Sequence, residues 1–177
     1  MTSGLPTIAW IGTGVMGASM AGHLQRAGYP LRVFTRTRSK AADLEAAGAT
    51  WCASAAEAAE GADIACLMVG YPEDVESQVL GQDGVLKTLA DGGLLIDFTS
   101  SRPELAVRIA ERAAERGIDA LDAPVSGGDV GAREARLSIM VGGTEEAFAR
   151  ARPLLELLGA NVVLQGPPGS FDATVTG

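Results

Sequence analysis

The sequence predicts an α/β domain whose mostly parallel sheet is doubly wound, with helices on both faces. Apolar runs of strand length alternate along the chain with alanine-rich segments of helical spacing, many of them ended by a glycine. The longest apolar run is unbroken, which is typical of a strand buried on both faces of a parallel sheet. With 177 residues, 47% of them hydrophobic, the chain is long enough to bury one core.

The charge and the cysteine content argue against several kinds of partner and site. The 14 basic and 22 acidic residues give a net charge of −8, which argues against a nucleic-acid partner or an anionic membrane surface. Cys52 and Cys66 are isolated, so neither a metal site nor a disulfide framework is indicated. The sequence begins without a basic and apolar leader, and no apolar stretch reaches the roughly 18 residues of a membrane span. We therefore expect a soluble, cytoplasmic protein.

The first predicted strand, residues 7–11, runs into glycines spaced G-x-G-x-x-G and then into a helix that ends at Gly28. Gly12 permits a tight turn, Gly14 allows backbone N–H groups to approach a pyrophosphate, and Gly17 allows the helix to pack close to the sheet. The helix dipole would favour the phosphates. A plain structural turn is the alternative. The residues predicted to bind a dinucleotide here are Gly12, Thr13, Gly14, Val15, Met16 and Gly17.

The second strand, residues 31–34, leads into a basic segment. A carboxylate at this point of a dinucleotide-binding fold would bind the 2′-hydroxyl of NAD, and the chain has none. Arg36 would instead form a planar fork on a 2′-phosphate, and Thr37 would donate its hydroxyl. We therefore favour NADP over NAD as the cofactor, the alternative being a solvated basic loop. The clustered bases and hydroxyls are Thr35, Arg36, Thr37, Arg38 and Lys40.

The next segments continue the alternation. The pattern predicts helices at residues 39–47 and 54–60, and strands at residues 49–52 and 63–69. The strand at 63–69 exits where α/β sheets bind ligands. Met68, Val69 and Gly70 are therefore expected to line the cofactor, although an ordinary strand-to-helix loop explains them equally well.

The strand predicted at residues 93–98 ends in three hydroxyls, Thr99, Ser100 and Ser101, followed by a proline. This indicates a helix N-terminus with Ser100 or Ser101 as the cap, and the helix at residues 103–116. The cap accounts for only one of the hydroxyls.

A second glycine pair follows residues 118–123. Ser126, Gly127 and Gly128 offer a hydroxyl and two backbone N–H donors to a small anion such as a carboxylate. A structural turn is the competing interpretation.

The remaining pattern predicts strands at residues 137–141 and 161–164, with a helix between them that Pro153 kinks or interrupts. His23, the single histidine, is expected on the surface of the first helix rather than in a catalytic site.

Together these segments resemble the β-hydroxyacid dehydrogenase family, which includes 3-hydroxyisobutyrate dehydrogenase and tartronate semialdehyde reductase. The resemblance extends from Ile8 to about Ser170. Its motifs are the glycine turn at 11–17, Thr-Arg-Thr at 35–37, Asp-Phe-Thr-Ser at 97–100, Asp-Ala-Pro-Val-Ser-Gly-Gly at 122–128 and Ile-Met-Val-Gly-Gly at 139–143.

This resemblance implies a Rossmann-like, NADP-binding domain at residues 1–165 and hydride transfer to or from a small β-hydroxyacid or its semialdehyde. It implies that Ser126, Gly127 and Gly128 bind the substrate carboxylate. It also implies that Thr99 lies at the substrate end and that Ser100 contacts the nicotinamide ribose side.

The resemblance fails in residues 166–177. Where the family has a lysine that serves as acid or base, this chain has Val175, and the all-helical C-terminal domain of the family does not follow. We therefore expect no catalytic residue, a divergent or truncated end, and poor turnover by the chain alone. Apolar surface that the helical domain would cover favours a homo-oligomer. A non-catalytic NAD(P)-binding module for sensing or interaction is the alternative.

Overall fold

The computed structural model describes residues 4–100 and 102–170. Within these residues the chain forms one sheet of nine strands. The strands are β1 (Ile8–Ile11), β2 (Leu31–Phe34), β3 (Thr50–Trp51), β4 (Ile64–Leu67), β5 (Leu94–Asp97), β6 (Asp119–Asp122), β7 (Val125–Ser126), β8 (Leu137–Gly142) and β9 (Gly159–Gly166).

The order of the strands identifies the edge of the sheet at which a ligand would bind. They lie in the order β3-β2-β1-β4-β5-β6-β8-β7, and β9 pairs with β8. Every pair from β3 to β6 is parallel, whereas β8 is antiparallel to β6 and β7. The direction of winding reverses between β1 and β4, which is the topological switch point of a doubly wound fold. The predicted Rossmann-like, mostly parallel sheet is thus confirmed.

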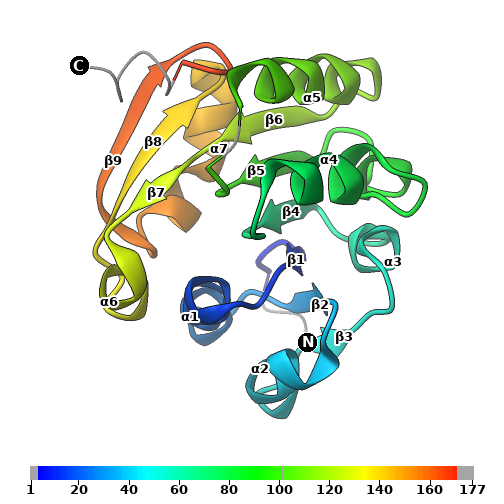
Figure 1. The fold of residues 1–177 in the computed structure, drawn as a ribbon, viewed down its shortest axis with the longest axis vertical. Helices are drawn as coiled ribbons and strands as arrows, with labels where there is room; N and C mark the ends of the chain where they lie inside the picture. The colour runs from blue at the N-terminus through cyan, green and yellow to red at the C-terminus, as the bar shows by residue number, and fades with distance from the viewer. Residues whose placement is uncertain (1–3, 101, 171–177) are drawn as a thin grey trace.

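Helices cover both faces of this sheet (Figure 1). In chain order they are α1 (Val15–Arg26), the 3-10 helix η1 (Arg38–Ala41), α2 (Ala42–Ala46), α3 (Ala55–Ala59), α4 (Pro72–Leu80), the 3-10 helix η2 (Val85–Lys87), α5 (Pro103–Glu115), α6 (Gly128–Arg133) and α7 (Glu145–Leu155). Buried residues of α1, α2, α6 and α7 share one hydrophobic core, and those of α3, α4 and α5 share another. None of the described helices is both long and apolar enough to cross a membrane.

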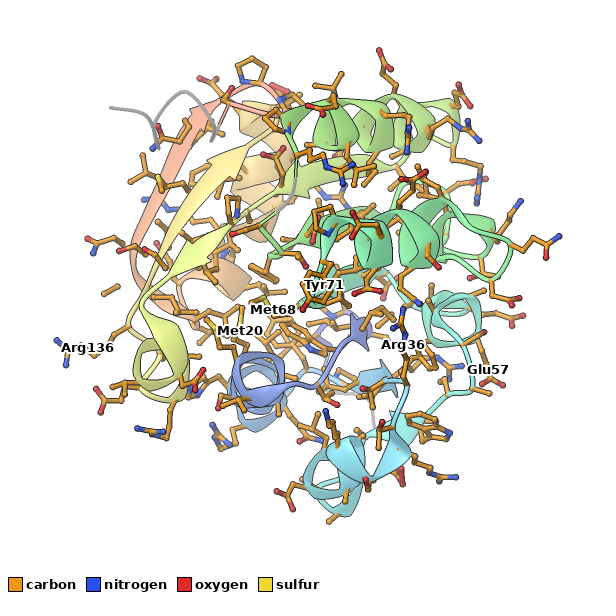
Figure 2. All side chains as sticks on the ribbon, viewed as in Figure 1. Met20, Arg36, Glu57, Met68, Tyr71 and Arg136 are labelled. Carbon is orange, nitrogen blue, oxygen red and sulfur yellow. The ribbon has the colours of Figure 1, made fainter. Side chains whose placement is uncertain are left out.

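Alternate residues of β1 enter these two cores. Ile8 and Trp10 belong to the core beneath α1, and Ala9 and Ile11 belong to the core beneath α3 to α5. Because successive side chains of a strand point to opposite faces, a central strand covered on both sides is apolar throughout. Figure 2 shows Met20 of α1 in the interior, with charged side chains around the outside of the molecule.

The structure refines two local expectations, at Pro153 and His23, and contradicts a third, the serine cap of α5. Helix α7 continues through Pro153 to Leu155, so the proline does not interrupt it, although it lacks the backbone N–H that would donate to the preceding turn. Helix α5 has Arg102 as its N-cap, without a side-chain cap, and Ser101 lies outside the described residues. His23 is half-buried, and its Nε2 lies 2.8 Å from the carbonyl oxygen of Ala132, so it joins α1 to α6.

Candidate functional site

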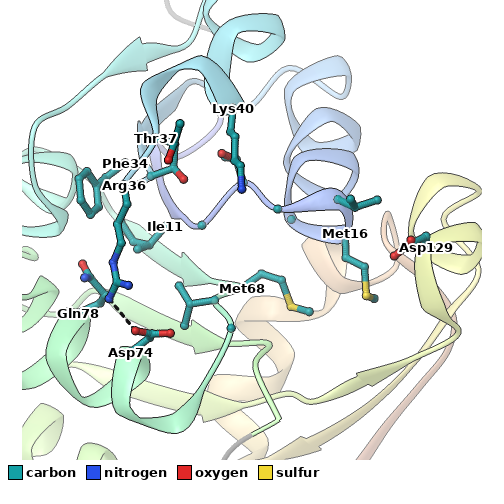
Figure 3. Close-up of a pocket in the computed structure, with 18 residues that line it drawn as sticks. Ile11, Met16, Phe34, Arg36, Thr37, Lys40, Met68, Asp74, Gln78 and Asp129 are labelled. Carbon is teal, nitrogen blue, oxygen red and sulfur yellow. Dashed lines mark hydrogen bonds and ion pairs between the residues drawn. The ribbon is translucent and has the colours of Figure 1, made fainter.

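A cleft of about 460 Å³ opens at the carboxyl ends of β1, β2 and β4, beside the switch point of the sheet (Figure 3). Its walls are the turn after β1, the start of α1, the basic segment after β2, the exit of β4, and α4. Three segments predicted to bind a cofactor therefore meet here. Their lining residues are Gly12, Thr13, Gly14, Val15, Met16, Gly17, Thr35, Arg36, Thr37, Met68, Val69 and Gly70.

The glycine turn leaves no space for side chains at its first and last glycines. Gly12 has a φ of 101°, and a Cβ on it would lie 2.2 Å from the carbonyl oxygen of Met68. A Cβ on Gly17 would lie 2.2 Å from the carbonyl oxygen of Gly12. The Trp10 indole N–H donates to that same carbonyl at 2.7 Å, and its ring stacks on Phe98. The turn is therefore held by β4, α1 and the core.

Gly14 differs, because no described atom beyond its chain neighbours and its own helix lies within 4 Å of a Cβ built on it. Its φ of −65° is open to any residue, so the backbone conformation does not require glycine. No side chain caps the N-terminus of α1, and its first turn carries no acid. Unpaired N–H groups at a helix N-terminus attract anions. This exposed, bare main chain fits the diphosphate of a dinucleotide.

The basic segment after β2 divides into two parts. Arg36 and Lys40 line the cleft. Arg38 points elsewhere, because its guanidinium donates to both carboxylate oxygens of Glu45, at 3.0 and 3.2 Å, and lies over the Trp51 ring. The expectation that Arg38 joins the phosphate cluster is therefore wrong.

Arg36 reaches across the cleft to α4. Its Nη2 lies 2.6 Å from Oδ1 of Asp74, as the dashed line in Figure 3 marks. Gln78, one turn further along α4, lines the same wall. The sequence offered no signal for these two residues, because they stand 38 or more positions from Arg36 and only the fold brings them together. Lys40, predicted with Arg36 as part of the basic cluster, lines the cleft, and the lining residues that sequence reasoning did not assign to the site are Ile11, Phe34, Asp74, Gln78 and Asp129.

Thr99 links the exits of two neighbouring strands. Its side chain is buried, with Oγ1 accepting a hydrogen bond from the Val69 N–H at 3.0 Å. Its own N–H donates to Oδ1 of Asp97 at 2.9 Å. The hydroxyl thus holds the end of β5 to the end of β4 and does not line the cleft.

Two buried acids stand side by side at the carboxyl ends of β5 and β6, where Asp97 pairs in register with Asp122. Burial raises the pKa of Asp97 to about 7, and the neighbouring carboxylate adds to the rise, whereas hydrogen bonds from Thr99 oppose it. Burial likewise raises the pKa of Asp122 to about 6. Oδ1 of Asp122 accepts from the Gly169 N–H at 3.1 Å, and Oδ2 has no partner among the described residues.

The other predicted site residues lie outside the cleft. Ser100 is exposed after β5, and three exposed residues join β7 to α6: Ser126 ends β7, Gly127 is the N-cap of α6, and Gly128 begins α6. Asp129, the residue that follows them, lines the end of the cleft near Met16 (Figure 3). The serine-diglycine loop therefore adjoins the cleft through α6, and its role in substrate binding stays a prediction.

Two expectations concern what the site lacks. Val175, at the position of the family lysine, lies outside the described residues. Among the residues that the structure describes, no group of three or more histidine, cysteine or acidic side chains is placed to hold a metal ion.

Comparison with known proteins identifies the family. Residues 7–166 match the NAD binding domain of 6-phosphogluconate dehydrogenase. The chain is 48% identical to an uncharacterized oxidoreductase, YkwC, of Bacillus subtilis, over 95% of this chain and 58% of that protein. It is 44% identical to 3-hydroxyisobutyrate dehydrogenase of Pseudomonas aeruginosa, over 92% of this chain and 55% of that protein.

A solved structure agrees with this relationship. Mycobacterium tuberculosis 3-hydroxyisobutyrate dehydrogenase with L-serine is 35% identical and superimposes with a TM-score of 0.89, over 97% of this chain and 58% of that one. The chain thus spans somewhat more than half the length of the relatives it matches. The resemblance inferred from the motifs is confirmed, and the chain belongs to the NAD binding domain family of 6-phosphogluconate dehydrogenase, with 3-hydroxyisobutyrate dehydrogenases among its relatives.

Proposed function

We propose that this chain is the cofactor-binding part of an NADP-preferring oxidoreductase of small β-hydroxyacids or their semialdehydes. The observation that carries the proposal is the cleft itself. At one side Gly14 presents bare main chain at the N-terminus of α1, and at the other Arg36 and Lys40 supply positive charge. A bound nicotinamide ring supplies or accepts the hydride. The protein binds and orients the cofactor through this cleft.

The preference for NADP rests on the segment after β2. The cleft-lining residues that directly follow β2, Thr35, Arg36 and Thr37, include no carboxylate to accept the 2′-hydroxyl of NAD. Arg36 is largely exposed and carries two hydrogen-bonding edges that suit a phosphate. Lys40 adds a second positive charge on the same wall.

The substrate class rests on the relatives and on the serine-diglycine loop. We propose that Ser126, Gly127 and Gly128 bind a substrate carboxylate, with Thr99 and Ser100 at the neighbouring strand end. The relative bound to L-serine, a small acid with a β-hydroxyl, supports this class. With Val175 in place of the family lysine, we propose that this chain alone turns over slowly. The two free, buried cysteines are consistent with a cytoplasmic location.

A fluorescence titration with NADPH and NADH tests the proposal. We expect the protein to bind both cofactors, with NADPH the tighter. Arg36→Ala should weaken NADPH binding by about 1.5–3 kcal/mol, the scale of hydrogen bonds to charged groups, and leave NADH nearly unchanged.

Arg38→Ala is the matched control, since it removes the same charge from the same segment but from a side chain bound to Glu45 outside the cleft. It should change the affinity for neither cofactor by more than about 0.5 kcal/mol. Absence of binding by either cofactor at submillimolar concentration would contradict the proposed function. An equal loss for NADPH and NADH in Arg36→Ala would contradict the preference.

A further inference from the structure

The cation expected to bind the 2′-phosphate is already paired with an acid. Arg36 Nη2 and Asp74 Oδ1 are 2.6 Å apart, and both residues line the cleft. The guanidinium end of Arg36 extends over the cleft toward α4 (Figure 3). Asp74 therefore occupies one of the guanidinium nitrogens with which an incoming phosphate could pair.

The first turn of α4 positions Asp74 beside the exit of β4. It lies in the first turn of α4, where its N–H donates to the carbonyl oxygen of Tyr71 at 3.0 Å. Its side chain is only 21% exposed, and Oδ2 lies 3.6 Å from a Cβ built on Gly70, so it stands against the exit of β4. Arg36, by contrast, is 69% exposed on a long side chain. The carboxylate is therefore the more enclosed partner of the pair, and the arginine is the more exposed one.

The other acids of α4 do not share this arrangement. Glu73 pairs with Arg102 at 2.6 Å, and Glu76 pairs with Arg108 of α5 at 2.8 Å. Neither lines the cleft. Of the acids on α4, Asp74 is thus the one whose negative charge faces the cofactor site.

A carboxylate at this position acts differently on the two cofactors. A 2′-phosphate on Arg36 must either displace Asp74 or share the guanidinium with it, and in both cases it lies close to the negative charge of Asp74, which repels it. A 2′-hydroxyl carries no charge, so it meets neither cost, and a carboxylate is a good acceptor for it. The sequence places no acid at the end of β2, and the fold supplies one from α4.

We propose that Asp74 is a specificity-determining residue that opposes NADP and lowers the preference set by Arg36. This inference rests on the proposed cofactor site and adds a second, opposing determinant to it. Arg36 attracts the 2′-phosphate, and the neighbouring carboxylate of Asp74 limits that attraction.

The test compares the dissociation constants of NADPH and NADH for the wild-type chain, Asp74→Asn and the control Glu76→Gln, measured by fluorescence titration. Asp74→Asn keeps the size of the side chain and removes its charge. We expect it to tighten NADPH about three- to tenfold and to leave NADH unchanged or slightly weaker. Because the effect is electrostatic, the gain for NADPH should shrink as the salt concentration rises. Glu76→Gln removes one charge from the same helix away from the cleft and should change both constants by less than about twofold.

A second measurement separates competition from a general charge effect. In an Arg36→Ala background, Asp74→Asn should tighten NADPH less than it does in the wild-type chain, since no guanidinium is left to release. Weaker NADPH binding by Asp74→Asn would instead mean that the carboxylate orients Arg36, and it would overturn the inference. Equal tightening of NADPH and NADH would also overturn it. Absence of binding in every variant would contradict the proposed function itself, which distinguishes the two failures.

Discussion

Asp97 is a buried acid whose protonation depends on the residues around it. Its carboxyl group is buried at the end of β5 with Asp122 beside it, and it accepts the N–H of Thr99. Through Thr99 it is connected to Val69 at the edge of the cofactor cleft. This acid therefore supports the site without lining it.

The raised pKa of Asp97 predicts the sign of a pH effect on stability. Between the ordinary carboxyl pKa near 3.8 and the folded value of about 7, the folded state retains a proton that the unfolded state has lost. The free energy of unfolding should therefore fall as pH rises through this range. Asp97→Asn should remove this loss. The free energy of unfolding of the variant, minus that of the wild type, should therefore rise by about 2–4 kcal/mol from pH 4 to pH 8.

Urea denaturation at a series of pH values measures this difference. Asn keeps an oxygen that can accept the Thr99 N–H, so the variant should retain the local structure. If the two proteins show parallel pH profiles, Asp97 is ionised in the folded state at all these pH values and the assignment is incorrect.

Single residues also show where sequence reasoning reaches its limit. Arg36 was predicted because the end of a strand and its following bases are adjacent in sequence. Asp74 was not, because only the packing of α4 against the exit of β4 brings it within 2.6 Å of Arg36. Arg38 was assigned to the phosphate wrongly, since its partners Glu45 and Trp51 come from elements whose directions the sequence does not give.

In the turn from β1 into α1, two glycines have different roles. We expect Gly14 to leave the main chain accessible to the cofactor, whereas Gly17 allows α1 to pack close to the turn. Gly14→Ala should leave the free energy of unfolding within about 1 kcal/mol of wild type, because its φ suits alanine and no described neighbour obstructs a Cβ. The same change should weaken NADPH binding at least about tenfold, since a methyl group would stand where the diphosphate approaches the main chain.

Gly17→Ala is the matched variant. Its Cβ would lie 2.2 Å from the carbonyl oxygen of Gly12, so α1 must move away from the turn. We expect a loss of about 1–3 kcal/mol in stability, the usual range for overpacking. Urea denaturation and NADPH titration of both variants test the pair. The account would be wrong if Gly14→Ala bound NADPH as tightly as the wild type.

At the scale of elements, the parallel βα units were predictable and the region after β6 was less so. An unbroken apolar run such as that of β4 predicts from the sequence alone that the strand is buried on both faces. Helix α6 was missed because its glycine-rich sequence has low helix propensity, and it forms where α1 packs against it through His23. The strand expected at 161–164 is longer as β9, since its pairing with β8 includes residues with no apolar pattern.

The whole molecule combines a cofactor cleft with an apolar rim. Val15, Tyr71 and Val130 are more than half exposed, and they lie at or next to residues that line different walls of the cleft. Exposed apolar side chains at a site favour contact with a further protein surface. The homo-oligomer expected from the sequence therefore stays a prediction, with this rim as its candidate surface.

The most direct measurement is a crystal structure of the protein grown with NADP. The account predicts the diphosphate against the main-chain N–H groups at Gly14 and the start of α1, and the 2′-phosphate on Arg36 with Asp74 released from it. A cleft that remains empty at saturating NADP, or one filled by the side chains of the protein itself, would contradict it.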